Sequence, residues 1–205
     1  MTQSEWWLRD AEQTSREHPY TFYKPSQAVI QKLGPGSQVK LIFEFRNQEP
    51  VGPSAERMWV EITDVAGDRY RGVLRNKPVY IKGLALDDSV EFEEKHVIDT
   101  EYKDPDPGLV EKYIVRCFVT NRVLYGRERA GYLYREEPDE DKDSGWRLMV
   151  GDESDEYMND PENISYVSLG AVLDRDASFI DLLDEPAGSA YRRNETTGRF
   201  ESYDG

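Results

Sequence analysis

The residues best suited to chemistry are carboxylates gathered in two acidic segments. The first spans Glu136–Asp143 and the second spans Asp152–Glu156. Between residues 135 and 162 the chain has 12 Asp and Glu against 3 Lys and Arg, a local net charge of −9. Carboxylates at this density have four possible roles: a cation site, acid–base catalysis, a solvated turn or a surface that binds a basic partner.

The first acidic segment partly matches a calcium-binding loop. Asp139, Asp141 and Asp143 occupy the first three ligand positions of an EF-hand. The rest of the pattern fails, because the glycine comes late, at Gly145, and Val150 stands where the bidentate glutamate is required. We therefore expect a hairpin turn with no metal and no cofactor.

The second acidic segment places Asp152, Glu153, Asp155 and Glu156 beside Tyr157. Two carboxylates serve as acid and base when burial moves their pKa values apart. Carboxylates this crowded and hydrophilic are expected to stay exposed and ionised. The same charge density instead favours attraction of a basic protein.

Other catalytic candidates are few. The single cysteine, Cys117, lies in an apolar alternation that favours a buried thiol. His18 and His96 are the only histidines, too few for the usual zinc site of nitrogen and sulfur ligands. No glycine-rich phosphate loop and no G-x-S-x-G motif occurs. We predict that the protein has no catalytic residues and is not an enzyme.

Composition narrows the class of partner. The net charge of −15 disfavours binding to the phosphates of nucleic acid. Aromatic residues at 12 % argue against disorder. One cysteine excludes an intramolecular disulfide, and neither a signal peptide nor an apolar run of about 18 residues occurs. We expect a cytoplasmic protein that does not associate with membranes.

Short alternating strands predict a β-rich first domain. We expect short leading helices capped by Ser4 and Ser26. Strands are predicted in QVKLIFEF, MWVEITDV, YRGVL, PVYI and SVEF. Together they indicate a small SH3-like β-barrel or sheet.

A proline-rich segment, residues 100–112, predicts a linker and therefore two domains, residues 1–104 and 105–205. The second is predicted to be α+β, with strands in YIVRCFVT, LYGRERAGYLY and SGWRLMV. The acidic turn joins the last two strands. Helices in SLGAVL and DASFIDLLD, an edge strand in GSAYRR and a frayed tail are expected to follow.

Trp146 follows the acidic turn, and its role is open between two interpretations. It is either a core residue or, if exposed, a hydrophobic anchor inside an acidic ring.

The second domain resembles a known family. The elements that match are GYLYREEPD, DSGWR, GDESDEYM, DPEN and LLDEPAGSA, within residues 113–193. They are similar to the bacterial immunity proteins of the family numbered thirty-three among polymorphic-toxin immunity proteins. The first domain resembles a small β domain often fused ahead of it. The resemblance implies a protein that is encoded near a secreted toxin and neutralises it, without a catalytic residue or a cofactor.

The leading hypothesis is thus an immunity protein that occludes a basic toxin domain through its acidic surface. The main alternative is a regulatory or housekeeping module whose first domain binds a peptide or nucleotide through exposed aromatics near Trp59, Tyr70 and Tyr80. A third hypothesis is an enzyme that uses the carboxylates with a metal ion. The predicted partner-binding residues are Glu136, Glu137, Asp139, Glu140, Asp141, Asp143, Trp146, Asp152, Glu153, Asp155, Glu156 and Tyr157.

Overall fold

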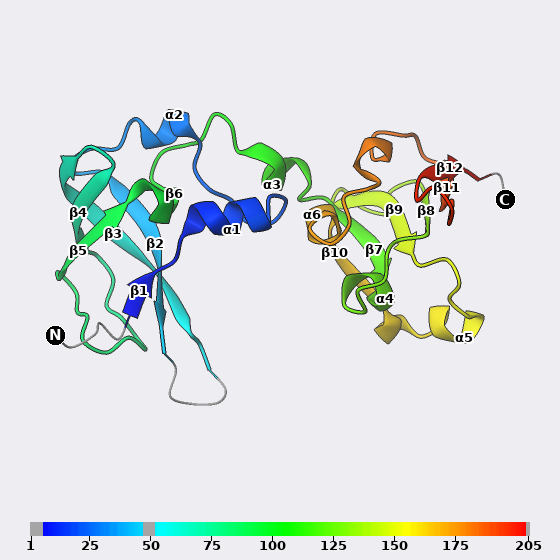
Figure 1. Cartoon of the computed structure of the whole chain (residues 1–205), viewed down its shortest axis with the longest axis horizontal. Helices are drawn as coiled ribbons and strands as arrows, with labels where there is room; N and C mark the ends of the chain where they lie inside the picture. The colour runs from blue at the N-terminus through cyan, green and yellow to red at the C-terminus, as the bar shows by residue number, and fades with distance from the viewer. Residues whose placement is uncertain (1–5, 47–51, 204–205) are drawn as a thin grey trace. The chain divides into compact units, whose positions relative to one another are not determined.

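The computed structural model describes residues 6–46 and 52–203. The chain divides into two compact units, with the boundary between Gly108 and Leu109. Both units mix short helices with strands, so the predicted α+β class is confirmed. Each unit is built on its own six-stranded sheet (Figure 1). The domain boundary predicted at residue 104 stays a prediction.

The first unit is a strongly curved, barrel-like sheet with the strand order β1-β2-β3-β4-β5. Strand β2 also pairs with β6 through its first residues, while its last residues pair with β1. The elements are β1 Trp6–Leu8, α1 Ala11–Glu17, α2 Gln27–Ile30, β2 Gln38–Phe45, β3 Ala55–Ala66, β4 Arg69–Leu74, β5 Ser89–Glu93, the 3-10 turn Glu94–His96 and β6 Val97–Thr100.

The core of the first unit is formed by alternate residues of its strands. Leu41 and Phe43 of β2 and Met58, Val60 and Ile62 of β3 are fully buried, as the period of two predicts. The small SH3-like barrel or sheet is therefore confirmed.

One predicted strand of the first unit is wrong. PVYI is a bent loop, because the Glu56 carboxylate accepts hydrogen bonds from three successive backbone N–H groups, those of Val79, Tyr80 and Ile81, at 2.6–2.9 Å. A backbone bonded to a side chain in this way has no ladder partner.

The first leading helix begins later than predicted. Trp6 and Trp7 are extended and pair with β2, and Asp10 caps α1 by accepting from the Gln13 amide at 2.8 Å. The predicted cap Ser4 lies outside the described residues. Ser26 does precede α2, but its hydroxyl donates to Asp104.

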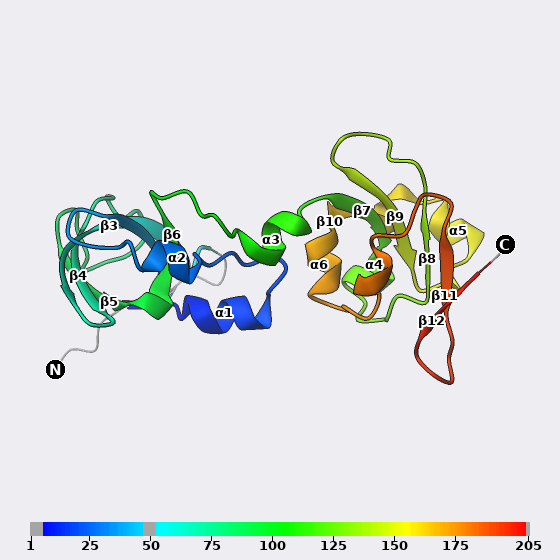
Figure 2. The same cartoon turned by 90° about the horizontal axis from the view of Figure 1, so that it is seen from above.

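The second unit is a mixed sheet with the strand order β10-β7-β9-β8-β11-β12. In Figure 2 its strands follow one another in this order from β10 to β11, and the connection between β8 and β9 extends away from the sheet. The elements are α3 Gly108–Lys112, β7 Arg116–Thr120, α4 Asn121–Leu124, β8 Tyr132–Arg135, β9 Asp143–Met149, α5 Asp155–Met158, the 3-10 turn Pro161–Asn163, β10 Ile164–Ser168, α6 Leu169–Leu173, the 3-10 turn Ile180–Leu182, β11 Ala190–Arg193 and β12 Phe200–Ser202.

The last third of the chain differs from expectation in two places. The segment DASFIDLLD is only a 3-10 turn, because the Asp176 carboxylate bonds the amide of Ser178 and the guanidinium of Arg193. The tail is not frayed as far as residue 203, where its description ends: β12 pairs with β11, so β11 is not an edge strand.

A glycine next to a bulge gives the first prediction. An alanine Cβ at Gly72 of β4 would lie 2.5 Å from Val60 Cγ1 and 2.6 Å from the Glu61 carbonyl oxygen. Because backbone must move, we expect Gly72→Ala to lower the free energy of unfolding by about 1–3 kcal/mol. Urea titration checks this. Gly34→Ala, at a site with nothing within 4 Å, is the control and should leave stability unchanged or slightly raised.

Candidate functional site

The first acidic segment forms the turn of an antiparallel hairpin between β8 and β9. Tyr134 pairs with Arg147 and Arg135 with Trp146. Gly145 (φ +79°) closes the hairpin, and a Cβ there would lie 2.1 Å from the Glu136 carbonyl oxygen. The hairpin therefore requires glycine at this position, and the expected acidic turn between the two strands is present.

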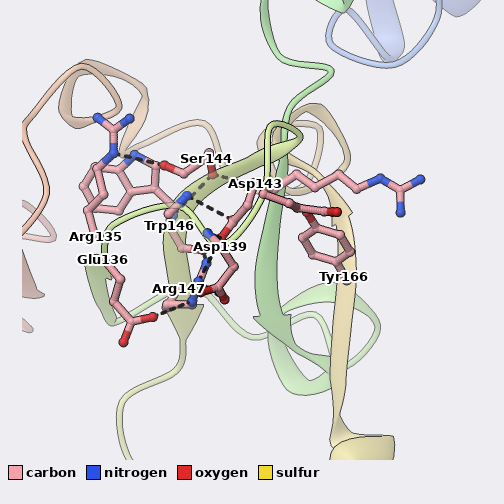
Figure 3. A network of polar contacts seen from close by, with 11 residues as sticks. Arg135, Glu136, Asp139, Asp143, Ser144, Trp146, Arg147 and Tyr166 are labelled. Carbon is pink, nitrogen blue, oxygen red and sulfur yellow. Dashed lines mark hydrogen bonds and ion pairs between the residues drawn. The ribbon is translucent and has the colours of Figure 1, made fainter.

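A buried ion pair holds the acidic turn against the sheet. The guanidinium of Arg147 donates to both carboxylate oxygens of Asp143, at 3.0 and 2.9 Å, and to Glu136 at 2.9 Å. Asp139 lies 3.6 Å away, so three carboxylates surround one guanidinium (Figure 3). The side chain of Asp143 is 1 % exposed and that of Arg147 is 9 % exposed.

The electrostatics of this pair favour both charged forms. Burial alone would raise the pKa of Asp143, but hydrogen bonds from Arg147 and from the Gly145 and Asp139 amides leave the pKa below its ordinary value. Burial opposes charge on Arg147 too, yet Asp143 and Glu136 raise its pKa. The pair is therefore ionised over the neutral range.

Two residues predicted to contact a partner are not at the surface. Trp146 is fully buried, and its indole N–H donates to the Leu183 carbonyl at 3.3 Å. The core interpretation of Trp146 is correct and the anchor interpretation is wrong, because β9 turns its ring to the helix-covered face. Asp143 is buried by its pairing with Arg147.

The remaining carboxylates of the turn are exposed. Glu140 accepts a hydrogen bond from the Tyr166 hydroxyl at 2.8 Å. Within the described residues the carboxylates of Glu137 and Asp141 have no hydrogen bond or ion pair. An open depression beside them is lined by Arg116, Glu140, Asp141 and Lys142.

The second acidic segment divides in the same way. Glu153 is partly buried and accepts from the amides of Val150 and Gly151 and from the Thr120 hydroxyl, at 2.7–2.8 Å. Burial would raise its pKa, but these bonds lower it. Asp152 pairs with Arg122 at 2.7 Å. The carboxylates of Glu153 and Asp152 therefore stabilise the loop through contacts within the domain.

Two carboxylates of the second segment have no structural partner within the described residues. Asp155 and Glu156 are exposed in the first turn of α5, and no hydrogen bond or ion pair engages either carboxylate within the part of the chain that the structure describes. Tyr157 beside them is half-buried, and its hydroxyl lies 3.5 Å from the Asn163 carbonyl.

The two acidic segments do not form one continuous patch. The turn 136–142 precedes β9 and the loop 151–158 follows it. Strand β9 lies between them, although its register against β7 shifts, so that residues 143–147 oppose only residues 116–118. The carboxylates therefore flank the sheet at opposite ends of β9.

The comparisons with known families identify both halves of the chain. Residues 3–121 match the family described as an uncharacterized protein conserved in bacteria (DUF2314), and residues 117–204 match the immunity protein Imm33 domain. The chain belongs to the DUF2314 family and carries an Imm33 domain. The family resemblance seen in the sequence is thereby confirmed. No curated protein and no solved structure matches the chain.

The thiol and the possible metal ligands of the chain are its remaining candidate reactive groups. Burial raises the pKa of Cys117 to about 12, so its thiol is protonated at neutral pH. Over residues 6–46 and 52–203, no three His, Cys, Asp or Glu side chains are grouped to hold a metal ion. The same part of the chain has no helix with the length and apolar character that crossing a membrane requires.

Sequence reasoning missed the residue that organises the Imm33 site. The structural role of Arg147 could not be predicted, because a single arginine in an apolar strand does not indicate that three carboxylates will surround it. A regular strand would separate residues four positions apart by about 13 Å. The pair with Asp143 therefore depends on the irregularity of β9 around Gly145, which the local pattern does not reveal.

Removing one charge of the buried pair should destabilise the Imm33 domain. Loss of one partner of a buried ion pair costs about 3–5 kcal/mol. Because Glu136 and Asp139 still face Arg147, we expect Asp143→Asn to cost about 3 kcal/mol, near the lower bound of that range. Urea unfolding followed by the 19F resonance of fluorinated Trp146 measures this. Glu91→Gln, which breaks the exposed pair with Arg71, is the control and should leave that transition in place.

The stability that Asp143 provides should depend on pH with a definite sign. Its pKa is lowered in the folded state, so its contribution is fully present above the ordinary carboxyl pKa of about 4 and is lost as pH falls through the lowered value. The stability difference between the wild type and Asp143→Asn should therefore be constant near neutrality and shrink in acid. Urea titrations at successively lower pH test this, and a difference that grows in acid would contradict it.

Proposed function

We propose that this chain is an immunity protein that neutralises a toxin by binding and occluding it, and that it works in the cytoplasm. The Imm33 match supports an immunity role, which implies a protein partner in general. The proposal that binding occurs through an acidic surface rests on one observation: some carboxylates stabilise the fold, while others are exposed and have no partner among the described residues. Asp143 and Glu153 are used for folding, whereas Glu137, Asp141, Asp155 and Glu156 are exposed and without partners among the described residues.

These free carboxylates suit contact with cationic residues of a toxin. Exposed charges steer a protein of opposite charge into place and raise its association rate. Glu136, Asp139 and Glu140 extend the acidic turn, although each already has a partner in Arg147 or Tyr166. Asp152 extends the second loop. A toxin that holds its substrate with Lys or Arg would be blocked by this surface.

Binding without catalysis is the mode of action that this proposal requires. Proteins of immunity families generally act without catalysis, and Cys117, the one thiol, is protonated and buried. We infer that the chain is not an enzyme and that its effect is stoichiometric.

The alternative, a regulatory module built on the first unit, lacks the observation that would favour it. Tyr70 is buried and stacks on Phe92 at 5.2 Å. Trp59 is half-buried beneath the Lys40 ammonium, and only Tyr80 of the three aromatics is exposed.

Charge reversal tests the acidic contact. The purified full chain is titrated against a candidate toxin domain taken from the genes that neighbour its own, and association is followed by stopped flow at low and high salt. We expect Glu137→Lys combined with Asp141→Lys to slow association on the order of tenfold at low salt. The salt dependence of the rate should also weaken.

The matched control reverses two exposed acids of the first unit, Asp64→Lys with Asp68→Lys, which change the net charge equally. If this control slows association as much as the hairpin variant, net charge alone is responsible. If neither slows it, the acidic contact is wrong. Failure of the wild-type chain to bind the toxin domain would overturn the immunity proposal itself.

A further inference from the structure

One face of the second sheet carries a continuous row of aromatic and arginine side chains. Strand register places Tyr166, Phe118, Arg147 and Tyr134 side by side across β10, β7, β9 and β8. Directly opposed residues share a face of a sheet. Two positions further along β8, Tyr132 lies between Met149 and Arg192 on that same face. We call this row the open face, with members Phe118, Tyr132, Tyr134, Arg147, Met149, Tyr166 and Arg192.

The opposite face of the sheet is the core. Cys117, Val119, Leu133, Trp146 and Leu148 alternate with the open-face residues and are all buried. Helices α4 and α6 contact β7 and β10 and supply buried leucines and valines. Because these helices cover the core face, they leave the other face to its own side chains.

The open face remains accessible. Phe118, Tyr132, Tyr134, Met149 and Tyr166 are all half-buried, and Arg192 is exposed. Each therefore keeps area that a partner can cover. Tyr, Phe, Met and Arg are the residue types enriched at the centres of protein interfaces.

The side chains of the open face are already ordered by one another. Phe118 stacks on Tyr166 with ring centres 4.7 Å apart, and Arg147 lies 4.8 Å above the Phe118 ring. Tyr132 packs on Tyr134 at 5.7 Å. A partner therefore meets side chains whose rotamer entropy is largely lost before binding.

We propose that the open face is the centre of the toxin contact, and that it fits a protein surface with an apolar middle and Lys or Arg on two opposite sides. This inference rests on the proposed function and locates its contact. Desolvated aromatics would supply most of the affinity, and the acidic segments would form the polar rim.

Charge complementarity selects this occupant. At one end of β9, the six carboxylates of residues 136–143 are accompanied by Lys142, Arg147 and Arg116, a net of −3. At the other end, Asp152, Glu153, Asp155 and Glu156 give −4, since Arg122 is balanced by Glu128. Cations on two opposite sides of the partner would match both ends.

The same charges argue against other occupants. Stacked aromatics beside arginine also suit single-stranded RNA, but the charge of Arg147 is neutralised by three carboxylates, and acidic ends repel phosphates. A second copy of this chain would bring −15 against −15.

Truncation at the centre tests the inference with the same toxin domain. We expect Tyr132→Ala to raise the dissociation rate at least tenfold, while association at low salt stays near wild type. Tyr125→Ala is the matched control, because Tyr125 is 67 % exposed at the end of α4, which packs on the core face. It should leave both rates unchanged. The 19F resonance of Trp146 verifies that each variant is folded.

Hydroxyl-radical footprinting of the wild-type complex gives a readout that needs no variant. Oxidation of Tyr132, Tyr134, Met149 and Tyr166 should fall on binding, while that of Tyr125 should not. Toxin binding without this protection, or with Tyr125 protected instead, overturns the inference and leaves the immunity proposal standing. Absence of wild-type binding overturns both. Binding of a single-stranded RNA oligonucleotide to the open face, or dimers of the chain that Tyr132→Ala dissociates, would likewise contradict it.

Discussion

The ion pair between Asp143 and Arg147 is the interaction on which the second unit depends. Two charges taken out of water incur a desolvation cost that their attraction offsets only with near-ideal hydrogen bonding. Here Asp143 accepts from the two terminal guanidinium nitrogens and from two backbone amides. Arg147 in turn has Glu136, Asp139 and the ring of Phe118 around it. A single arginine thereby connects the turn, the sheet and the aromatic row.

Carboxylates carry much of the local architecture in both units. Glu56 bonds three backbone amides of the bent loop after β4. Asp104 accepts hydrogen bonds from the amide and hydroxyl of Ser26 and from the Tyr23 hydroxyl. After β9, Glu153 likewise accepts hydrogen bonds from two backbone amides. Each such bond to a charged acceptor contributes about 1.5–3 kcal/mol. The acidity of the chain is thus partly structural, and only the unpaired remainder is available for recognition.

Much of the fold could be predicted from the sequence, because burial on one face imposes a period of two. The strands at Gln38–Phe45 and Arg69–Leu74 and the helix capped by Ser168 follow from local pattern alone. The parallel pairing of β7 with β9 could not be predicted, since it joins strands that are distant in sequence. The loop at PVYI was missed for a related reason: its partner, Glu56, lies more than twenty residues earlier.

The candidate site was predicted in part. Acidic composition located both segments, but it could not separate the carboxylates that fold the chain from those that remain free. That distinction depends on where Arg147, Arg122 and the backbone amides come to lie. The aromatic row was equally hidden, because Phe118, Tyr134 and Tyr166 are brought together only by strand order.

In the hairpin, the residues that stabilise the turn differ from those that determine its exposed charge. Asp143, Gly145 and Arg147 fix the turn from within β9, whereas Glu137 and Asp141 point outward and support nothing among the described residues. Substitutions at the outward positions alter the charge pattern while leaving the frame intact. In the proposed immunity role, single substitutions at these exposed positions would change which toxin the domain recognises without refolding it.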